Sequence, residues 1–446
     1  MGGDEPAQRT TIVLRDGRVE AVTRYSARIL DLTLDELQPL LPAVVVNGAK
    51  GVGKTATASR RARSVVSFDR RADRELFDAD PQMLNHLPGP VLVDEWQRRP
   101  DSWDIVRRAV DEGAAKGRFL LAGSAGLLDD VPVHSGAGRM VSFQMRPMSI
   151  AERHPGTATV SLRDLLAGGA TVAGSTDLRL ADYTQMIVES GYPDIRQEPG
   201  RVRTARLDGY LDAVVQREFA EQGHRVRRPQ VLRNWLTAYA AATATTASYS
   251  TITEAATPGL ANKPAKDSVR VYRDVLTSLW LLDPVAAWLP SRNRIARLGQ
   301  APKHYLADPA LAASLLGVDA AGLLRGHEGK TGLQLREGQL LGRLFEHLVV
   351  MSVHTYAEAA GAVVRHLRTS SGAREVDMVL ERRDGTVVAM EVKLSASVDS
   401  DDVTHLHWLK EQVGDDMVDA VVITTGQHAY RRKDSVAVVP AALLGP

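Results

Sequence analysis

The segment from Gly48 to Thr55 constrains the fold more than any other part of the chain, because it fits the pattern G-x-x-x-x-G-K-[ST] in full. Its residues are Gly48, Ala49, Lys50, Gly51, Val52, Gly53, Lys54 and Thr55. A short apolar run at 43–46 precedes it, and a helix is predicted from Thr55 to about Arg63. The glycines allow turns with positive φ, so successive N–H groups can face a phosphate chain. A strand, loop and helix in this order predict a parallel α/β sheet that binds ATP at the loop.

Carboxylates beyond the loop complete the expected site. Lys54 is expected to contact the β- and γ-phosphates of ATP, and the Thr55 hydroxyl is expected to ligate Mg²⁺. Further along, an apolar strand at 91–93 ends in Asp94 and Glu95. A carboxylate at the carboxyl edge of a parallel sheet lies beside the loop, so Asp94 is the candidate second metal contact. Glu95 is the candidate general base for the attacking water, and a solvated acidic pair is the plainer alternative.

Three further residues are candidates for contact with the γ-phosphate. Ser124 follows the apolar strand 119–122, where its hydroxyl can reach the γ-phosphate or the water; a simple serine turn is the alternative. Arg139 and Arg146 flank the strand at 140–143. Either one can supply a cation to the charge that develops on the phosphate, and Arg139 is the stronger candidate of the two. Ordinary surface arginine is the alternative for both.

Apolar runs alternate with helical stretches over residues 31–150, the pattern of a parallel sheet covered on both faces. The predicted strands are 43–46, 65–68, 90–93, 119–122 and 140–143. Residues 1–30 form a polar N-terminal arm, and residues 151–335 are predicted to be mostly helical. Within this middle region, 248–280 is predicted as helix, turn and helix, and the apolar run 281–289 suits a short hairpin. That order is the outline of a winged helix.

Residues 336–446 return to a mixed α/β pattern, predicted as an α-β-β-β-α-β order with a hairpin turn at Asp384-Gly385. Asp377 lies on one predicted strand, and Glu391 and Lys393 lie two residues apart on the next, so these two side chains share a face. Glu346, on the preceding helix, can complete the cluster. Such carboxylates can hold a divalent cation, and the lysine can orient a water. A structural or binding role stays open beside nuclease activity, because E-x-K is a common pattern on strands.

The chain resembles known ATPases over roughly residues 25 to 425. The phosphate-loop residues resemble the AAA-type P-loop ATPases, and the chain resembles a widespread bacterial and archaeal family that joins an AAA core to a C-terminal domain of unknown function. The resemblance is carried by GAKGVGKT, VLVDEWQRRPD, LLAGSAGLL, GAGRMVSFQMRPMS, ESGYPD, QAPKHYLADPALAASLLG, GRLFEHLV, EVDMVLE and AMEVK. One departure is the short second strand, VVSFD, where the family has a longer one.

The resemblance also implies roles for individual residues. It implies ATPase roles for Lys54, Thr55, Asp94 and Glu95, with Ser124 as the first sensor and Arg139 as a phosphate-sensing arginine. Because the arginine finger of AAA proteins reaches a neighbouring subunit, it implies a homo-oligomer. The E…D…E-x-K order of the last hundred residues resembles the PD-(D/E)xK nuclease core, which cuts phosphodiesters with Mg²⁺.

Composition excludes several classes of protein. Lys+Arg number 55 against 54 Asp+Glu, so the chain is no bulk polycation and any basic surface must be local. The candidate surfaces for DNA are the clusters at 225–233, 292–297 and 366–374, with solvated helix faces as the alternative. Cysteine is absent, which excludes disulfides, thiolate metal sites and cysteine nucleophiles. The histidine spacing gives no zinc motif.

The amino terminus lacks the basic start and apolar run of a signal peptide. No apolar stretch approaches the roughly 20 residues that a membrane helix needs. We therefore expect a cytoplasmic protein with no membrane contact.

Three hypotheses follow from the sequence. The first is an ATPase that hydrolyses ATP with Mg²⁺ and drives a conformational change in the winged-helix-like and nuclease-like modules, with DNA as the candidate partner. The second is a nucleotide-gated DNA-binding or protein-interaction switch with little turnover. The third is a metal-dependent DNA nuclease at Asp377, Glu391 and Lys393.

Overall fold

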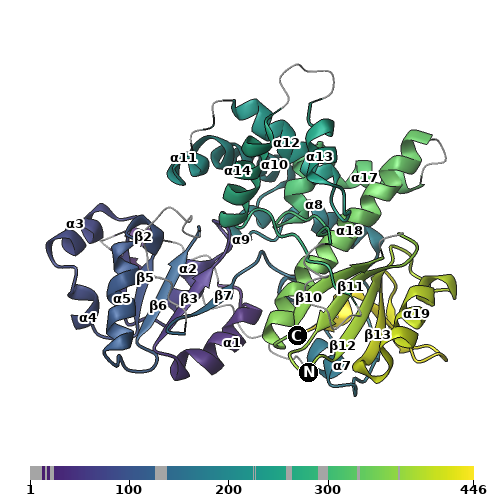
Figure 1. The fold of residues 1–446 in the computed structure, drawn as a ribbon, viewed down its shortest axis with the longest axis horizontal. Helices are drawn as coiled ribbons and strands as arrows, with labels where there is room; N and C mark the ends of the chain where they lie inside the picture. Colours follow the sequence, from purple (N-terminus) through teal and green to yellow (C-terminus); the bar gives the residue numbers. More distant parts are fainter. Residues whose placement is uncertain are drawn as a thin grey trace, which may run out of the picture.

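Figure 1 shows the computed structural model, which has a sheet domain, a helical middle region and a second sheet domain. It describes residues 25–125, 138–224, 226, 228–257, 264–289, 300–328, 332–369 and 372–446, and the backbone of β1 (Val13–Arg15) and β2 (Arg18–Glu20). For residues 328 and 332–338 only the backbone is described. The predicted basic cluster at 292–297, and Arg225 and Arg227 of another, lie outside the described residues.

A parallel five-stranded sheet with the order β4-β5-β6-β3-β7 forms the first domain. Its strands are β3 (Ala43–Asn47), β4 (Ser64–Ser67), β5 (Val91–Asp94), β6 (Phe119–Gly123) and β7 (Val141–Gln144). Each lies within one residue of its predicted range, and the predicted α/β class is confirmed.

Helices cover both faces of this sheet, so successive strand residues are buried on opposite sides. Val44 and Val46 pack in one core with the helices α1 (Ile29–Leu37) and α2 (Lys54–Ser59). Val45 packs in the other core, on the opposite face. The helices of that face are α3 (Arg71–Ala79), α4 (Met83–His86) and α5 (Asp101–Asp111). Both faces are therefore closed, and the carboxyl edge of the sheet is the place left for a site.

The middle region is mostly helical, as predicted. Its helices include α6 (Ile150–Arg153), α7 (Leu162–Leu166), α8 (Leu180–Glu189), α9 (Pro193–Arg196), α10 (Gly200–Ala213), the π-helical segment η3 (Val214–Glu218), α11 (Phe219–Glu221), α12 (Pro229–Ala241), α13 (Tyr249–Ala255), α14 (Lys266–Ser278), α16 (Pro309–Leu316) and α17 (Ala320–Glu328). After α14, antiparallel bridges join Leu282 to Leu306 and Val285 to Lys303, in line with the expected hairpin. A parallel bridge then joins Ala287 to His366 of the C-terminal domain, so this hairpin is docked on that domain.

The C-terminal domain is a mixed sheet with the order β10-β11-β12-β13-β15-β14-β9. Its strands are β10 (Val363–Arg368), β11 (Glu375–Glu381), β12 (Val387–Val392), β13 (Met417–Thr424), β14 (His428–Arg431), β15 (Ala437–Pro440) and β9 (Gly174–Ser175). The helix α19 (Thr404–Val413) connects β12 to β13, which pair in parallel. The predicted turn at Asp384-Gly385 is present, with Gly385 at φ 91°.

The predicted boundary at 335/336 falls inside a helix. The helix α18 (Gly332–Ala359) runs from the middle region to the C-terminal sheet (Figure 1) and begins before its predicted start near Leu340. The C-terminal sheet also takes β9 from residues 174–175, and β8 (Val160–Ser161) pairs with β16 (Leu444–Gly445). The two regions are therefore interleaved in the sequence. Among the described residues, no helix has the length and apolar character required to cross a bilayer.

Candidate functional site

The phosphate loop leaves the carboxyl end of the central strand β3 and ends at α2, as the motif predicts. Gly48 has a φ of 150°, and a Cβ there would lie 2.2 Å from the backbone oxygen of Met145. Gly53, the residue before α2, is left-handed at φ 103°. These two positions need glycine, because a side chain would collide with backbone in one case and strain it in the other. Glycine at these positions therefore lets the loop pass close to Met145 and turn into α2.

Lys54 lies inside this loop. Its side chain is buried, and Nζ donates hydrogen bonds to the carbonyl oxygens of Gly48 at 2.8 Å and Ala49 at 2.9 Å. Burial lowers the pKa of Lys54 to about 8, although the carboxylates of Glu95 and Asp94 act in the opposite direction. A buried ammonium is costly unless an anion balances it, so the loop favours a negatively charged ligand.

The side chains of Thr55, which follows Lys54, and Asp94 are in contact. Thr55 Oγ1 donates a hydrogen bond to Asp94 Oδ1 at 2.8 Å, and Ser67 Oγ donates to Asp94 Oδ2 at 3.1 Å. Asp94 ends β5 and Ser67 ends the neighbouring strand β4, so parallel pairing sets the two side chains at one edge. A hydroxyl and a carboxylate are the hard oxygen donors that Mg²⁺ prefers, and these residues fit that ion.

Glu95 follows Asp94 in the left-handed conformation, at φ 53°. Its Oε2 accepts hydrogen bonds from Gln97 Nε2 at 2.6 Å and from Ser124 Oγ at 3.1 Å. Burial raises the pKa of Glu95, while the charge of Lys54 lowers it. The structure therefore brings the predicted residues Glu95 and Ser124 together beside the loop. Sequence reasoning missed Gln97, which lies two residues beyond the acidic pair.

The two candidate arginines do not lie at the loop of their own chain. Arg139 precedes the amino end of β7 and forms an ion pair with Asp111 at the end of α5, at the opposite edge of the sheet from the loop. Arg146 is buried and pairs with Asp283 at 2.7 Å and with Glu358 at 3.5 Å. The prediction that Arg146 reaches a phosphate is wrong, because its guanidinium joins the first domain to the middle region and α18. A contact from Arg139 to a neighbouring subunit stays a prediction.

A cleft of about 540 Å³ lies between the loop and the middle region. Lys50 and Gly51 line it from the loop, and Lys50 forms an ion pair with Glu218 of the π-helical segment at 2.8 Å. Further polar lining comes from Arg98, Ser124, Asp194, Arg206, Arg217 and Glu221. Ser124 was a candidate from the sequence, but Asp194, Arg206, Arg217 and Glu221 belong to the middle region and come to the cleft only through the tertiary fold. A π-turn inside a helix frequently marks a functional position.

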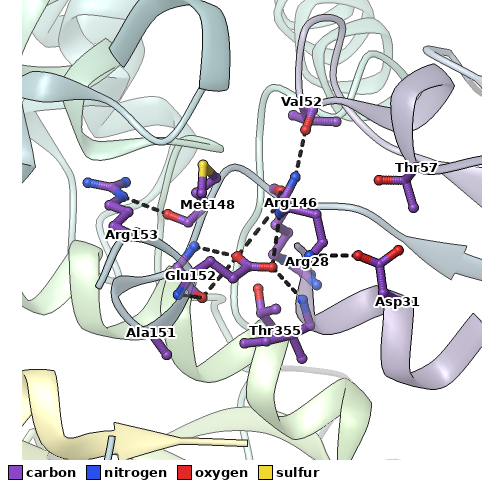
Figure 2. Close-up of polar contacts among 12 residues, drawn as sticks. Arg28, Asp31, Val52, Thr57, Arg146, Met148, Ala151, Glu152, Arg153 and Thr355 are labelled. Carbon is purple, nitrogen blue, oxygen red and sulfur yellow. Dashed lines mark hydrogen bonds and ion pairs between the residues drawn. The ribbon is translucent and has the colours of Figure 1, made fainter. Parts of the chain in front are cut away.

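A buried arginine that precedes the first domain in the sequence is hydrogen-bonded to the phosphate loop (Figure 2). Arg28 donates hydrogen bonds to the carbonyl oxygens of Val52 and Arg146, both at 2.7 Å, and to Glu152 Oε1 at 3.0 Å. Its side chain and that of Glu152 are 3% and 2% exposed. Glu152 also accepts from the backbone N–H of Ile29 and of Ser149. Arg28 thus joins the loop to α6, whereas the sequence placed it at the end of the polar N-terminal arm and predicted no role for it.

The C-terminal candidates Glu346, Asp377, Glu391 and Lys393 also lie close together, as predicted. A fifth residue, Lys303, stands among them. Its Nζ lies 2.7 Å from Glu346 Oε1, 2.9 Å from Asp377 Oδ1 and 3.2 Å from Glu375 Oε1. The side chain of Lys303 is 1% exposed. Sequence reasoning missed it because it lies in the middle region, in the segment QAPKHYLADP.

This cluster does not fit the divalent cation that the nuclease likeness implies. The ammonium of Lys303 already lies between the carboxylates that the cation would need. Glu391 Oε1 is buried without a hydrogen-bond partner, and burial together with the charge of Asp377 raises the pKa of Glu391 well above its usual range. Within the described part of the chain, no group of three acidic or histidine side chains is arranged to hold a metal ion.

Comparisons with known proteins agree with the first part of this site. Family models match three stretches: an AAA domain at 41–154, a domain of unknown function (DUF8612) at 180–322 and a domain of unknown function (DUF4143) at 341–444. The AAA match covers the parallel sheet and its phosphate loop, so this part of the chain is similar to AAA domains in fold and in the P-loop motif.

Similar whole chains include uncharacterized proteins of Mycobacterium bovis and Mycobacterium tuberculosis. Each is 24% identical over 410 residues, which is 90% of this chain and 80% of the relative. Among solved structures, the Walker-type ATPase of Pyrococcus abyssi matches with a TM-score of 0.34 and 14% identity, over 64% of this chain and 93% of that one.

Proposed function

We propose that this chain binds ATP with Mg²⁺ at the loop 48–55 and hydrolyses it. The observation that carries the proposal is the meeting of Thr55 Oγ1 and Asp94 Oδ1 at 2.8 Å beside the buried ammonium of Lys54. Lys54 and Thr55 begin the helix α2, and Asp94 ends the strand β5. Together they supply the cation and the hard oxygen ligands that a metal-bound triphosphate needs. The AAA match over 41–154 supports the same assignment.

Each side chain then has a task in phosphoryl transfer. The loop backbone and Lys54 bind the β- and γ-phosphates, with phosphate oxygens taking the place of the carbonyls of Gly48 and Ala49 as acceptors for Nζ. Thr55 and Asp94 would hold Mg²⁺, which neutralises charge between the phosphates. Glu95 orients and polarises the attacking water, with its carboxylate fixed by Ser124 and Gln97.

The cleft lies between the loop and the middle region, so nucleotide bound at the loop can act on the middle region. Lys50 belongs to the loop, and Glu218 belongs to the helical segment that follows α10, so their ion pair crosses the cleft. A triphosphate bound at the loop brings negative charge to the arginines of the cleft and competes with Glu218 for Lys50. We infer that the middle region changes its position on the first domain when nucleotide binds, and that the chain is an ATP-driven switch.

Substitutions of Lys54 and of Glu95 distinguish ATP binding from ATP hydrolysis. Lys54→Ala is expected to abolish ATP binding, and Glu95→Gln to keep binding and to lose turnover by about 100-fold or more. Calorimetry with a slowly hydrolysed ATP analogue and a phosphate-release assay measure the two steps. Unchanged turnover in folded Lys54→Ala would refute the proposal.

A DNA-binding switch with little turnover is the second candidate, favoured by one face of α14. Lys266, Arg270 and Arg273 follow each other at helical spacing, and Lys266 and Arg270 are exposed. This helix is the last of three before the docked hairpin, the position of a recognition helix in a winged-helix order. A gel-shift assay at low salt with wild type and Arg270→Glu tests it. Binding of a duplex that weakens with salt and with this substitution would support a DNA partner.

An oligomer is also part of the proposal, because Arg139 can contribute to hydrolysis only from a neighbouring chain. Sizing with and without ATP measures the assembly. Arg139→Ala is expected to lower turnover without lowering ATP affinity.

A further inference from the structure

The buried lysine of the C-terminal cluster comes from a different part of the chain than the carboxylates around it. Lys303 belongs to the middle region, whereas Glu346 lies on α18 and Asp377 on β11. The backbone of Lys303 pairs with Val285, and the chain from Val285 continues to a parallel bridge between Ala287 and His366 of β10. The hairpin that carries Lys303 is thus attached to the edge strand of the C-terminal sheet, and its ammonium points into the acidic cluster.

The contacts of Lys303 match those of a bound cation. Its Nζ lies within 3.2 Å of oxygens from three carboxylates, those of Glu346, Glu375 and Asp377. Tyr305, two residues further along the same segment, donates a hydrogen bond to Glu346 Oε1 at 2.5 Å. The remaining oxygen of Asp377 accepts the backbone N–H of Val392 at 2.9 Å. The oxygens of Glu346 and Asp377 that would face a metal ion are therefore engaged with protein donors, whereas Glu391 Oε1 has no hydrogen-bond partner.

The ammonium and a divalent cation exclude each other. Mg²⁺ or Mn²⁺ needs carboxylate oxygens at about 2.0–2.2 Å, and two of the available ones already lie at hydrogen-bond distance from Lys303. A second cation placed between Glu346 and Asp377 would also lie within a few ångströms of a positive charge that burial shields from water. Lys393 makes no comparably close ion pair in the cluster, since its Nζ lies 3.7 Å from both Glu391 and Asp402.

We propose that Lys303 is the resident cation of the C-terminal acidic cluster, and that the cluster is an ionic joint between the middle region and the C-terminal domain in place of a divalent-metal centre. The joint fastens the bridged segments 282–289 and 303–306 to the same helix, α18, that continues into the middle region. Metal-dependent cleavage of nucleic acid by Glu346, Asp377 and Glu391 is not expected while Lys303 is in place, because its ammonium holds the oxygens of Glu346 and Asp377 that a metal ion would need.

The direct test compares four forms of the full chain without nucleotide: wild type, Lys303→Met, Asp377→Asn and the double variant. Mn²⁺ binding is followed by the electron paramagnetic resonance signal of free Mn²⁺, and stability by thermal unfolding with and without Mn²⁺. We expect wild type and Asp377→Asn to bind the same amount of Mn²⁺, so any binding at the phosphate loop cancels in the comparison. Binding in wild type that Asp377→Asn removes would overturn the proposal.

The stability of the variants supplies a second readout. Lys303→Met leaves buried carboxylates without a counter-ion, so its melting temperature is expected to fall by at least about 5 °C and to recover in part with Mn²⁺. Adding Asp377→Asn removes one of these carboxylates and is expected to raise the melting temperature of Lys303→Met. A melting temperature unchanged by Lys303→Met would refute the joint, even with no Mn²⁺ bound.

Plasmid cleavage completes the test. Wild type with Mn²⁺ or Mg²⁺ is expected to leave a supercoiled plasmid intact. Cleavage by wild type that is lost in Asp377→Asn would show a working metal centre and would overturn the assignment of Lys303.

Discussion

Replacing Arg28 with methionine keeps the apolar stem of the side chain and removes the guanidinium that joins the phosphate loop to α6. Three acceptors lose a donor: the carbonyl oxygens of Val52 and Arg146 and the carboxylate of Glu152. Glu152 is 2% exposed and would keep its charge without its ion-pair partner. Removing one member of a buried pair costs roughly 3–5 kcal/mol, so we expect Arg28→Met to lower the free energy of unfolding by about that amount.

A double-mutant cycle with Glu152→Gln isolates the pair from the rest of the network. Glutamine removes the charge and keeps one acceptor oxygen, whereas Glu152 accepts from Ile29 N–H on Oε1 and from Ser149 N–H on Oε2. One of these two hydrogen bonds is therefore lost in Glu152→Gln, with or without Arg28, so this loss cancels in the cycle. The double variant is expected to lose about 1.5–3 kcal/mol less than the sum of the single changes, measured by urea unfolding. Losses that add within about 0.5 kcal/mol would refute the reasoning, because they would show no coupling between the two side chains.

The same cycle has a functional readout at the loop. Because Arg28 donates a hydrogen bond to the carbonyl oxygen of Val52 in the loop, Arg28→Met is expected to weaken ATP binding by about tenfold or more. Arg28→Lys, which keeps the charge but has a single donor group, is expected to fall between wild type and Arg28→Met. Equal ATP affinity in all three folded forms would limit Arg28 to a role in stability.

Three further predictions concern charge at and around the site. Because Lys54 is protonated only below a pKa of about 8, ATP affinity is expected to fall as the pH rises from about 7.5 to 9.5, measured by calorimetry. Burial raises the pKa of Asp283, but the charges around it, that of Arg146 above all, bring this pKa below its unfolded value. The stability that Asp283 contributes is therefore present above about pH 4 and is lost as the pH falls through the folded pKa. The excess stability of wild type over Asp283→Asn, from urea unfolding, should therefore shrink between about pH 5 and pH 2. Glu218→Gln is expected to change the free energy of unfolding by less than about 1 kcal/mol, because the side chain of Lys50 is 52% exposed; a larger loss in urea unfolding would contradict the weak pairing.

Local signals were enough to predict the first domain. Its strands are short apolar runs between glycine- or proline-containing turns, and a buried parallel strand has that pattern wherever it occurs. The phosphate loop is defined by glycines and a lysine within eight residues, so its conformation is set mainly by near neighbours. Thr55 and Asp94 are 39 residues apart. The sequence still predicted that both would contact one Mg²⁺, because the loop and the acidic residue each follow an apolar strand and the carboxyl ends of parallel strands meet at one edge of a sheet.

The sequence could not predict which charges meet across the domains. Arg146 was a candidate phosphate ligand, and the fold pairs it with Asp283, which is 137 residues away. Arg139 has the expected position beside a strand, but it lies at the amino edge of the sheet. Both differences have one cause: the sign of a charge is local, whereas its partner depends on how separate regions pack.

By itself, then, the sequence predicted an α/β domain with a P-loop motif, and an acidic group with one lysine on a strand near the end of the chain. The tertiary fold supplied a buried cation to that group, because it brings Lys303 from the middle region to within 2.7 Å of Glu346. Nothing in the residues around position 303 signals this contact, because the electrostatic environment of a buried side chain is made by segments that only folding brings together.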